Sequence, residues 1–65
     1  MEPERFTNAQ RGVLAYLLLG WSNREVAHQL QLSVRTVETH VEALLRRSRT
    51  RNRTALVAWW LQSQQ

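Results

Sequence analysis

Residues 22–41 read SNREVAHQLQLSVRTVETHV, and this stretch contains two helix start signals in succession. At the first, Ser22 precedes Glu25 by three positions. This is the spacing of a capping box, in which each side chain accepts a hydrogen bond from the other residue's backbone amide. Apolar residues then recur at helical spacing: Val26, Ala27 and Leu30. The pattern predicts a helix over about residues 23–30.

The second start signal is Ser33, a favoured N-cap residue. An apolar stripe follows it at helical spacing: Val37, Val41, Leu44 and Leu45. We therefore predict a second helix over about residues 34–47, with Leu32 as an apolar anchor in the turn before it. Because so few residues separate the two helices, they must cross steeply, and residues 22–47 are predicted to form a helix-turn-helix. The second helix of such a unit can enter the major groove of DNA.

A further helix is predicted upstream of this unit. Thr7 and Gln10 have the spacing of a capping box, and Gly20 suits the left-handed ending of a helix. Between them lies an apolar stripe: Val13, Leu14, Leu17 and Leu18. Phe6, just before the cap, is placed to pack onto the first turn.

A last helix is predicted downstream, after Asn52, which is a good N-cap residue. This helix should end near residue 62, and no β-strand is needed to account for the remaining residues. The whole chain, residues 1–65, is therefore predicted to be a single all-α domain, a four-helix helix-turn-helix fold.

The basic residues of the chain are all arginines. There are nine of them against five acidic residues, which gives a net charge of +4. Arginine suits phosphates and base edges because its planar guanidinium can donate two parallel hydrogen bonds. An arginine-rich genome would produce the same composition, and charge alone would equally allow an RNA or an acidic protein as partner.

The composition offers little for catalysis, metal binding or membrane insertion. The chain has no cysteine, aspartate or lysine, and its two histidines have no evident carboxylate partner. Without cysteine there can be no disulfides or thiolate metal sites, which fits a reducing cytoplasm. The longest apolar run, residues 13–19, is too short to span a bilayer. We therefore predict no enzymatic activity, no cofactor, no metal site, no membrane partner and a cytoplasmic location.

Residues 20–27 read GWSNREVA, and further matches continue at fixed spacing: Leu30, Leu32-Ser33, Thr36-Val37 and His40-Val41. This sequence pattern resembles that of the DNA-binding domain of LuxR-type transcriptional regulators. The resemblance extends to Phe6-Thr7 upstream and to Asn52-Arg53-Thr54 downstream. It implies transcription regulation through double-stranded DNA. It also implies an N-terminal regulatory domain, as in response regulators, that is missing from this chain; a small stand-alone regulator is the alternative.

The outer face of the second helix of the helix-turn-helix is predicted to recognise DNA. Helical spacing places five residues on one surface there: Arg35, Glu38, Thr39, Glu42 and Arg46. In LuxR-type domains, the positions that match Glu38, Thr39 and Glu42 face base edges. A glutamate can accept a hydrogen bond from the amine of cytosine, and Thr39 can contact a thymine methyl group. The alternative is that both glutamates are solvated and pair with Arg35 and Arg46 along the helix.

Phosphate contacts are predicted at two helix starts, where free backbone amides and a partial positive charge favour anions. The candidate residues are Asn23 and Arg24 at the first start, and Ser33, Arg35 and Thr36 at the second. A run of arginines is a further source of contacts: Arg46, Arg47, Arg49, Arg51 and Arg53. The alternative for this run is a solvated cluster, favoured by the negative end of the preceding helix. Trp21 is expected to pack over a helix end.

The last helix has more apolar residues than one helix face can bury. We predict an inward face made of Leu56, Val57, Trp60 and Leu61. Ala55 and Trp59 are then left outside, and the family resemblance implies a weak homodimer contact there. A two-fold dimer would explain a palindromic operator with half-sites about one DNA turn apart. The alternative is that Trp59 packs within the chain.

Two other functions fit the same scaffold. The acidic pair Glu38 and Glu42 would suit a protein-interaction module that has lost DNA binding and docks a partner through the last helix. The promoter-reading domains of sigma factors contain a related helix-turn-helix and give a third option within DNA binding.

The junction after residue 47 departs from the family pattern. LuxR-type domains usually have Lys-Leu-Gly-Val there, whereas this chain has Arg47-Ser48-Arg49-Thr50. Two core-facing side chains and a glycine suited to a left-handed helix cap are therefore replaced. Residues 47–52 are the part of the fold that the sequence predicts least well.

Overall fold

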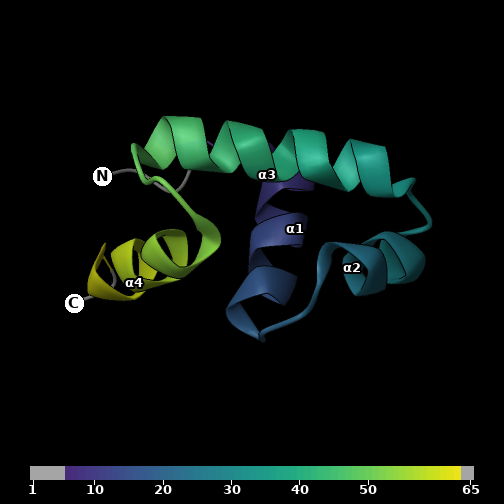
Figure 1. The fold of residues 1–65 in the computed structure, drawn as a ribbon, viewed down its shortest axis with the longest axis horizontal. Helices are drawn as coiled ribbons and strands as arrows, with labels where there is room; N and C mark the ends of the chain where they lie inside the picture. Colours follow the sequence, from purple (N-terminus) through teal and green to yellow (C-terminus); the bar gives the residue numbers. More distant parts are fainter. Residues whose placement is uncertain (1–5, 64–65) are drawn as a thin grey trace.

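Four helices make up residues 6–63, the part of the chain that the computed structural model describes. They are α1 (Asn8–Leu18), α2 (Asn23–Leu30), α3 (Val34–Ser48) and α4 (Arg53–Ser63). The described residues contain no strand, and the predicted all-α, four-helix fold is confirmed. Helix α3 is the longest; α2 and α4 lie beneath its two ends, with α1 between them (Figure 1). Residues 1–5 and 64–65, the ends of the predicted domain, lie outside the described residues.

The predicted helix start signals are confirmed by their hydrogen bonds. In α1, the Gln10 amide donates to Thr7 Oγ1 at 3.1 Å, and the Thr7 amide donates to Gln10 Oε1 at 3.2 Å. In α2, the corresponding distances between Ser22 and Glu25 are 3.1 and 2.8 Å. Each box satisfies two amides that have no partner within the helix. The sequence therefore encodes these two helix starts locally.

The helix ends are set by three residues with positive φ. Gly20 follows α1 with φ 88°, as predicted. Gln31 and Arg49 end α2 and α3 with φ 58°, although neither is a glycine. At the first of these, the Leu32 amide donates to the Ala27 carbonyl at 2.9 Å. This backbone bond closes the turn. The Leu32 side chain is 37% exposed and does not pack against the core, so its predicted role as an apolar anchor is wrong.

The core forms where α3 meets the other three helices. From α3 it takes Val37, Val41 and Leu44, the predicted inward stripe without Leu45, which is only partly buried. The remaining buried apolar residues are Phe6, Val13, Leu14, Leu17, Val26, Ala27 and Leu56. Because α3 contributes to every part of this core, its opposite face is left in solvent with a fixed orientation.

The inward face of α4 differs from the predicted one. Leu56 is fully buried, but Leu61 is 56% exposed, so its predicted inward position is wrong. Trp59 is half-buried instead of outside, and its ring meets that of Phe6 edge-on with centroids 6.0 Å apart. Trp60 is also half-buried, with its ring 6.4 Å from Phe6. The side chain of Phe6 therefore packs against both tryptophans of α4.

The junction after α3 keeps a buried residue at the position where the LuxR-type domains that the sequence resembles usually have leucine. That residue is Ser48, which is 8% exposed and extends α3 one position beyond its predicted end. Its hydroxyl donates to the Leu44 carbonyl at 2.8 Å and lies 2.7 Å from Thr50 Oγ1. The polar side chain is thus buried with its hydrogen bonds satisfied, which removes most of the penalty for burying it.

Arg49→Gly is expected to stabilise the domain, because Arg49 is exposed and holds a left-handed conformation that an L side chain disfavours. The gain in the free energy of unfolding should be about 0.5–1 kcal/mol, after the entropy that glycine adds to the unfolded chain. Urea denaturation measures it. Arg49→Ala is the matched control, since it removes the same charge and keeps the strain. Equal stabilisation by both variants would assign the effect to arginine–arginine repulsion.

Candidate nucleic-acid interface

The outer face of α3 presents the residues predicted to recognise DNA. Four of them are exposed: Arg35, Thr39, Glu42 and Arg46. Glu38, the fifth, is half-buried. The predicted division of α3 into an inner and an outer face is therefore confirmed, and all five side chains are accessible from one side of the helix.

Neither glutamate of this face is neutralised within the domain. In residues 6–63, no ion pair joins Glu38 or Glu42 to Arg35 or Arg46. The predicted alternative, in which these charges pair along the helix, is thus absent from the structure. An ionised carboxylate is an acceptor only. Both glutamates are therefore available to accept a hydrogen bond from a partner outside the chain.

The hydroxyl of Thr39 is used within α3. It donates to the carbonyl oxygen of Arg35 at 3.1 Å. The single hydroxyl hydrogen is then unavailable for a base acceptor, and the methyl group and the oxygen lone pairs remain. This state suits contact with a thymine methyl group more than donation to a base.

The start of α3 leaves one hydroxyl hydrogen free. Ser33 Oγ accepts from the Thr36 amide at 3.0 Å and donates to Thr36 Oγ1 at 2.8 Å. Because Thr36 Oγ1 is the acceptor of that bond, its own hydrogen can be donated outward. The hydroxyl lies at the positive end of the α3 dipole, where an anion is favoured.

The start of α2 holds a contact that the sequence did not reveal. Arg53, the first residue of α4, reaches back to the turn before α2 and donates through Nη1 to the Trp21 carbonyl at 2.9 Å. Its Nη2 donates to Asn23 Oδ1. Arg53 belongs to the arginine run predicted to contact phosphates, but in the structure its side chain joins the start of α4 to the start of α2. The partners lie 30 positions apart, so no local pattern could have found this pair.

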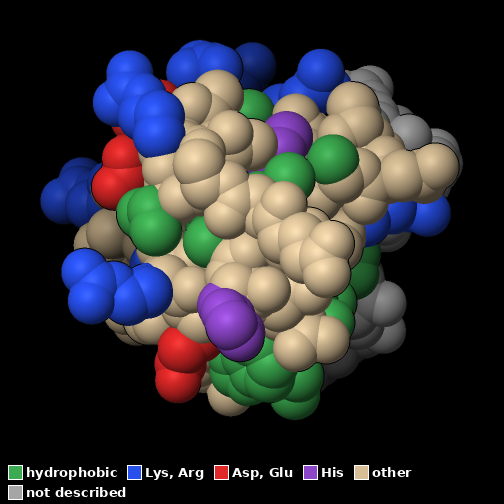
Figure 2. All heavy atoms as spheres, turned by 90° about the vertical axis from the view of Figure 1, so that its right-hand side faces the viewer, with side chains coloured by type: hydrophobic (Ala, Val, Ile, Leu, Met, Phe, Trp, Pro, Cys, Tyr) green, Lys and Arg blue, Asp and Glu red, His purple; other side chains and the backbone are tan. Residues whose placement is uncertain are grey.

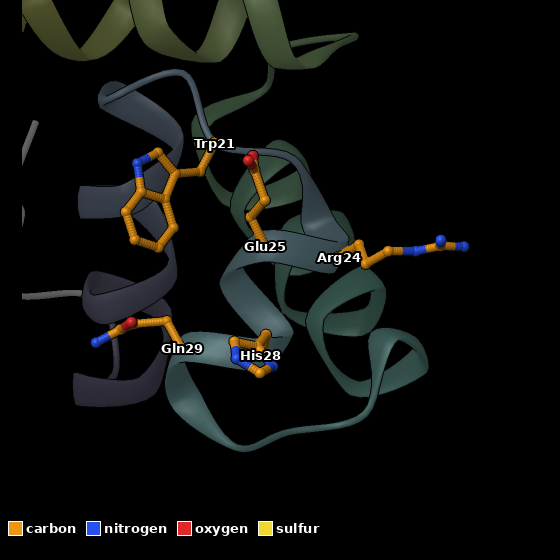
Figure 3. Close-up of a pocket in the computed structure, with 5 residues that line it drawn as sticks. All are labelled: Trp21, Arg24, Glu25, His28 and Gln29. Atoms are coloured by element: carbon orange, nitrogen blue, oxygen red, sulfur yellow. The ribbon is translucent and has the colours of Figure 1, made fainter.

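Trp21 packs as predicted over the end of α1, with its ring 4.5 Å from that of Tyr16. Beside it, Trp21, Glu25, His28 and Gln29 line an open hollow of about 400 Å³. The fifth lining residue, Arg24, points away from the others into solvent (Figure 3). Glu25 is already engaged in the helix cap, so the hollow offers no paired acid and base. Arg24 is therefore the exposed cation at the start of α2.

The charges at the α2 and α3 end of the molecule are interleaved. Figure 2 shows this end, with arginine side chains along its left and upper edges and acidic side chains close beside them. This surface therefore carries positive and negative side chains next to one another. Such a surface suits a partner with both anionic groups and hydrogen-bond donors, as duplex DNA has.

Residues 6–63 contain neither a cluster of metal ligands nor a membrane-spanning helix. Within this range, no group of three His, Cys, Asp or Glu side chains could hold a metal ion. None of the four described helices combines the length and the apolar character required to cross a bilayer.

Comparisons with known proteins agree with this geometry. The sequence profile described as "Bacterial regulatory proteins, luxR family" matches residues 4–60. The response regulator Rre1 of Synechocystis sp. is 42% identical over 57 residues, which cover 88% of this chain and 25% of that protein. The CsgBAC operon transcriptional regulatory protein of Escherichia coli is 36% identical over 58 residues, 89% of this chain and 27% of that protein.

A third relative is the probable transcriptional regulator ycf29 of Porphyra purpurea, 40% identical over 53 residues, 82% of this chain and 25% of that protein. The chain thus spans about a quarter of the length of the curated relatives it matches. These relatives are described as transcriptional or response regulators, which favours DNA binding over a protein-interaction module.

Proposed function

Because the chain belongs to the luxR family of bacterial regulatory proteins, whose helix-turn-helix domains bind DNA to regulate transcription, we propose that α3 reads base edges in the major groove. The observation that carries this proposal is the outer face of α3, which presents two unpaired carboxylates and a threonine methyl group. Base contacts specify sequence, and phosphate contacts fix the register of the helix on the duplex.

The phosphate contacts are assigned to the two helix starts. At α2 they would come from Asn23 and from Arg24, which points into solvent. At α3 they would come from the Thr36 hydroxyl and the exposed Arg35, with Ser33 holding the helix start in place. With α3 lying in the major groove, the starts of α2 and α3 would be the parts of the domain that contact the DNA backbone.

The base contacts are assigned to Glu38, Thr39 and Glu42, with Arg46 further along the same face. A carboxylate in a groove lined by phosphates is repelled, and it is tolerated where it accepts a hydrogen bond. In the major groove the donors are the amines of cytosine and adenine. We therefore propose that Glu38 and Glu42 select for cytosine and that Thr39 contacts a thymine methyl group.

Replacing Glu38 with glutamine tests the base contact. An amide can donate as well as accept, so Glu38→Gln should change which base pair is preferred at one position. The discrimination against the wrong base at that position should change by about tenfold. Binding to a panel of duplexes that differ in single base pairs measures it, with Glu42→Gln as the matched variant expected to act at a different base pair. A uniform gain in affinity for all duplexes would show that Glu38 only repels phosphates.

The relatives are about four times as long as the region that this chain matches, which supports a place for this domain in a longer regulator. We propose that this domain follows an N-terminal regulatory domain, as in response regulators, and acts in the cytoplasm, where bacterial DNA lies. We also propose a weak two-fold contact through α4 on a palindromic operator, made by Ala55 and the exposed part of Trp59. Trp59 also packs on Phe6, so less of its surface is available than an outward position would offer. One short helix supports only a small interface, so the two domains would pair mainly on DNA.

A further inference from the structure

The guanidinium of Arg53 joins two elements that the DNA-binding proposal treats separately. It is half-buried at the start of α4 and bonds the Trp21 carbonyl, at 2.9 Å, and Asn23 Oδ1. Both acceptors lie at the start of α2. One planar group thus holds the turn before α2 and a side chain of its first helical residue at once.

The guanidinium of Arg53 lies beside the start of α2, where it bonds two carbonyl oxygens. The start of a helix carries a partial positive charge, and a cation there is disfavoured. Within residues 6–63, no carboxylate pairs with Arg53; its partners are two neutral carbonyl oxygens. A phosphate at the start of α2 would reduce the repulsion between the cation and the helix end.

The chemistry of arginine also fixes which way Asn23 faces. A guanidinium has donors only, so the atom of Asn23 that meets it must be the carbonyl oxygen Oδ1. The amide nitrogen Nδ2 is then at the other end of the carboxamide, with two hydrogens to donate. Without Arg53, the carboxamide could rotate and present its oxygen to a phosphate, which would be repulsive.

We propose that Arg53 is a positioning residue for DNA binding: it holds the Asn23 carboxamide with Nδ2 toward the phosphate and ties the start of α2 to the first residue of α4. This inference rests on the proposed phosphate contact of Asn23. It predicts that Arg53 acts through Asn23, whereas a direct phosphate contact or a purely structural bond would act independently of it.

A double-mutant cycle tests the inference. Arg53→Gln should lower affinity for a duplex about tenfold, while Arg51→Gln, which removes the same charge from an exposed residue, should lower it about two- to threefold. In an Asn23→Ala background, Arg53→Gln should cost no more than Arg51→Gln. Additive losses from Arg53→Gln and Asn23→Ala would overturn the inference.

The side-chain amide signal of Asn23 gives a readout that a purely structural role would not move. In the wild type, this signal should shift on addition of duplex DNA, and in Arg53→Gln the shift should be lost while the backbone spectrum stays folded. A shift that persists in Arg53→Gln overturns the inference and leaves the proposed function intact. If the wild-type signal does not move and Asn23→Ala binds normally, the proposed contact of Asn23 is itself wrong.

Arg53→Lys keeps the test decisive if Arg53→Gln does not fold. Lysine retains the positive charge, but its ammonium is a point donor without the planar fork. We expect Arg53→Lys to lose the Asn23 signal shift and most of the affinity, despite the retained charge. Full affinity in Arg53→Lys would show that the charge, and not the fork, is what DNA binding requires.

Discussion

Leu56→Ala should lower the free energy of unfolding by about 2–5 kcal/mol, the range for truncating a buried leucine. Leu56 is fully buried and joins α4 to the core formed by α1 and α3. For 65 residues the total stability is roughly 3–10 kcal/mol, so this one change would remove much of it. Thermal and urea denaturation should show a large fraction of Leu56→Ala unfolded at moderate temperature.

Leu61→Ala is the matched control, because it removes the same atoms from the same helix. Leu61 is 56% exposed, so its truncation should change stability by no more than about 0.5 kcal/mol. Equal losses in the two variants would mean that α4 packs in the rotation first predicted from the sequence, with Leu61 inward.

Leu56 and Leu61 were both predicted to face inward, but only Leu56 is buried. The sequence therefore predicts the helices but not the rotation of α4. Helix starts were predictable because Thr7 with Gln10, and Ser22 with Glu25, form their hydrogen bonds within three positions of each other. The rotation of α4 was not, because apolar residues surround this helix on nearly all sides. Its orientation is set by contacts with residues far away in the chain, such as Phe6, which meets the rings of the two tryptophans.

The candidate site divides in the same way. The outer face of α3 followed from periodicity, because burying Val37, Val41 and Leu44 leaves a single face outside. The bond between Arg53 and Asn23 spans 30 positions and has no local signal. Whether a hydroxyl hydrogen is already donated within the domain, as in Thr39, or is available to a partner, as in Thr36, also depends on three-dimensional geometry. Composition and spacing therefore located the surface, and the structure determined the donors and acceptors on it.

Affinity for duplex DNA should fall steeply as salt rises, because phosphate contacts release bound counterions. The two helix starts and the exposed arginines of α3 suggest about four phosphate contacts for one domain, which predicts a slope of about −3.6 in a plot of log affinity against log salt. Between about 50 and about 200 mM salt, affinity for a single half-site would then fall by about 150-fold.

A duplex with two half-sites separates the single domain from the proposed dimer. If two domains bind together through α4, the slope should approach about twice the half-site value, because twice as many phosphates are contacted. Fluorescence anisotropy over a salt series measures both slopes, with a duplex of scrambled sequence as the control for specificity. A folded domain whose half-site affinity does not change with salt would contradict the phosphate contacts at α2 and α3. Equal slopes on one and two half-sites would contradict the proposed dimer alone. The phosphate contacts would still stand, because they are made by α2 and α3, whereas the dimer contact is on α4.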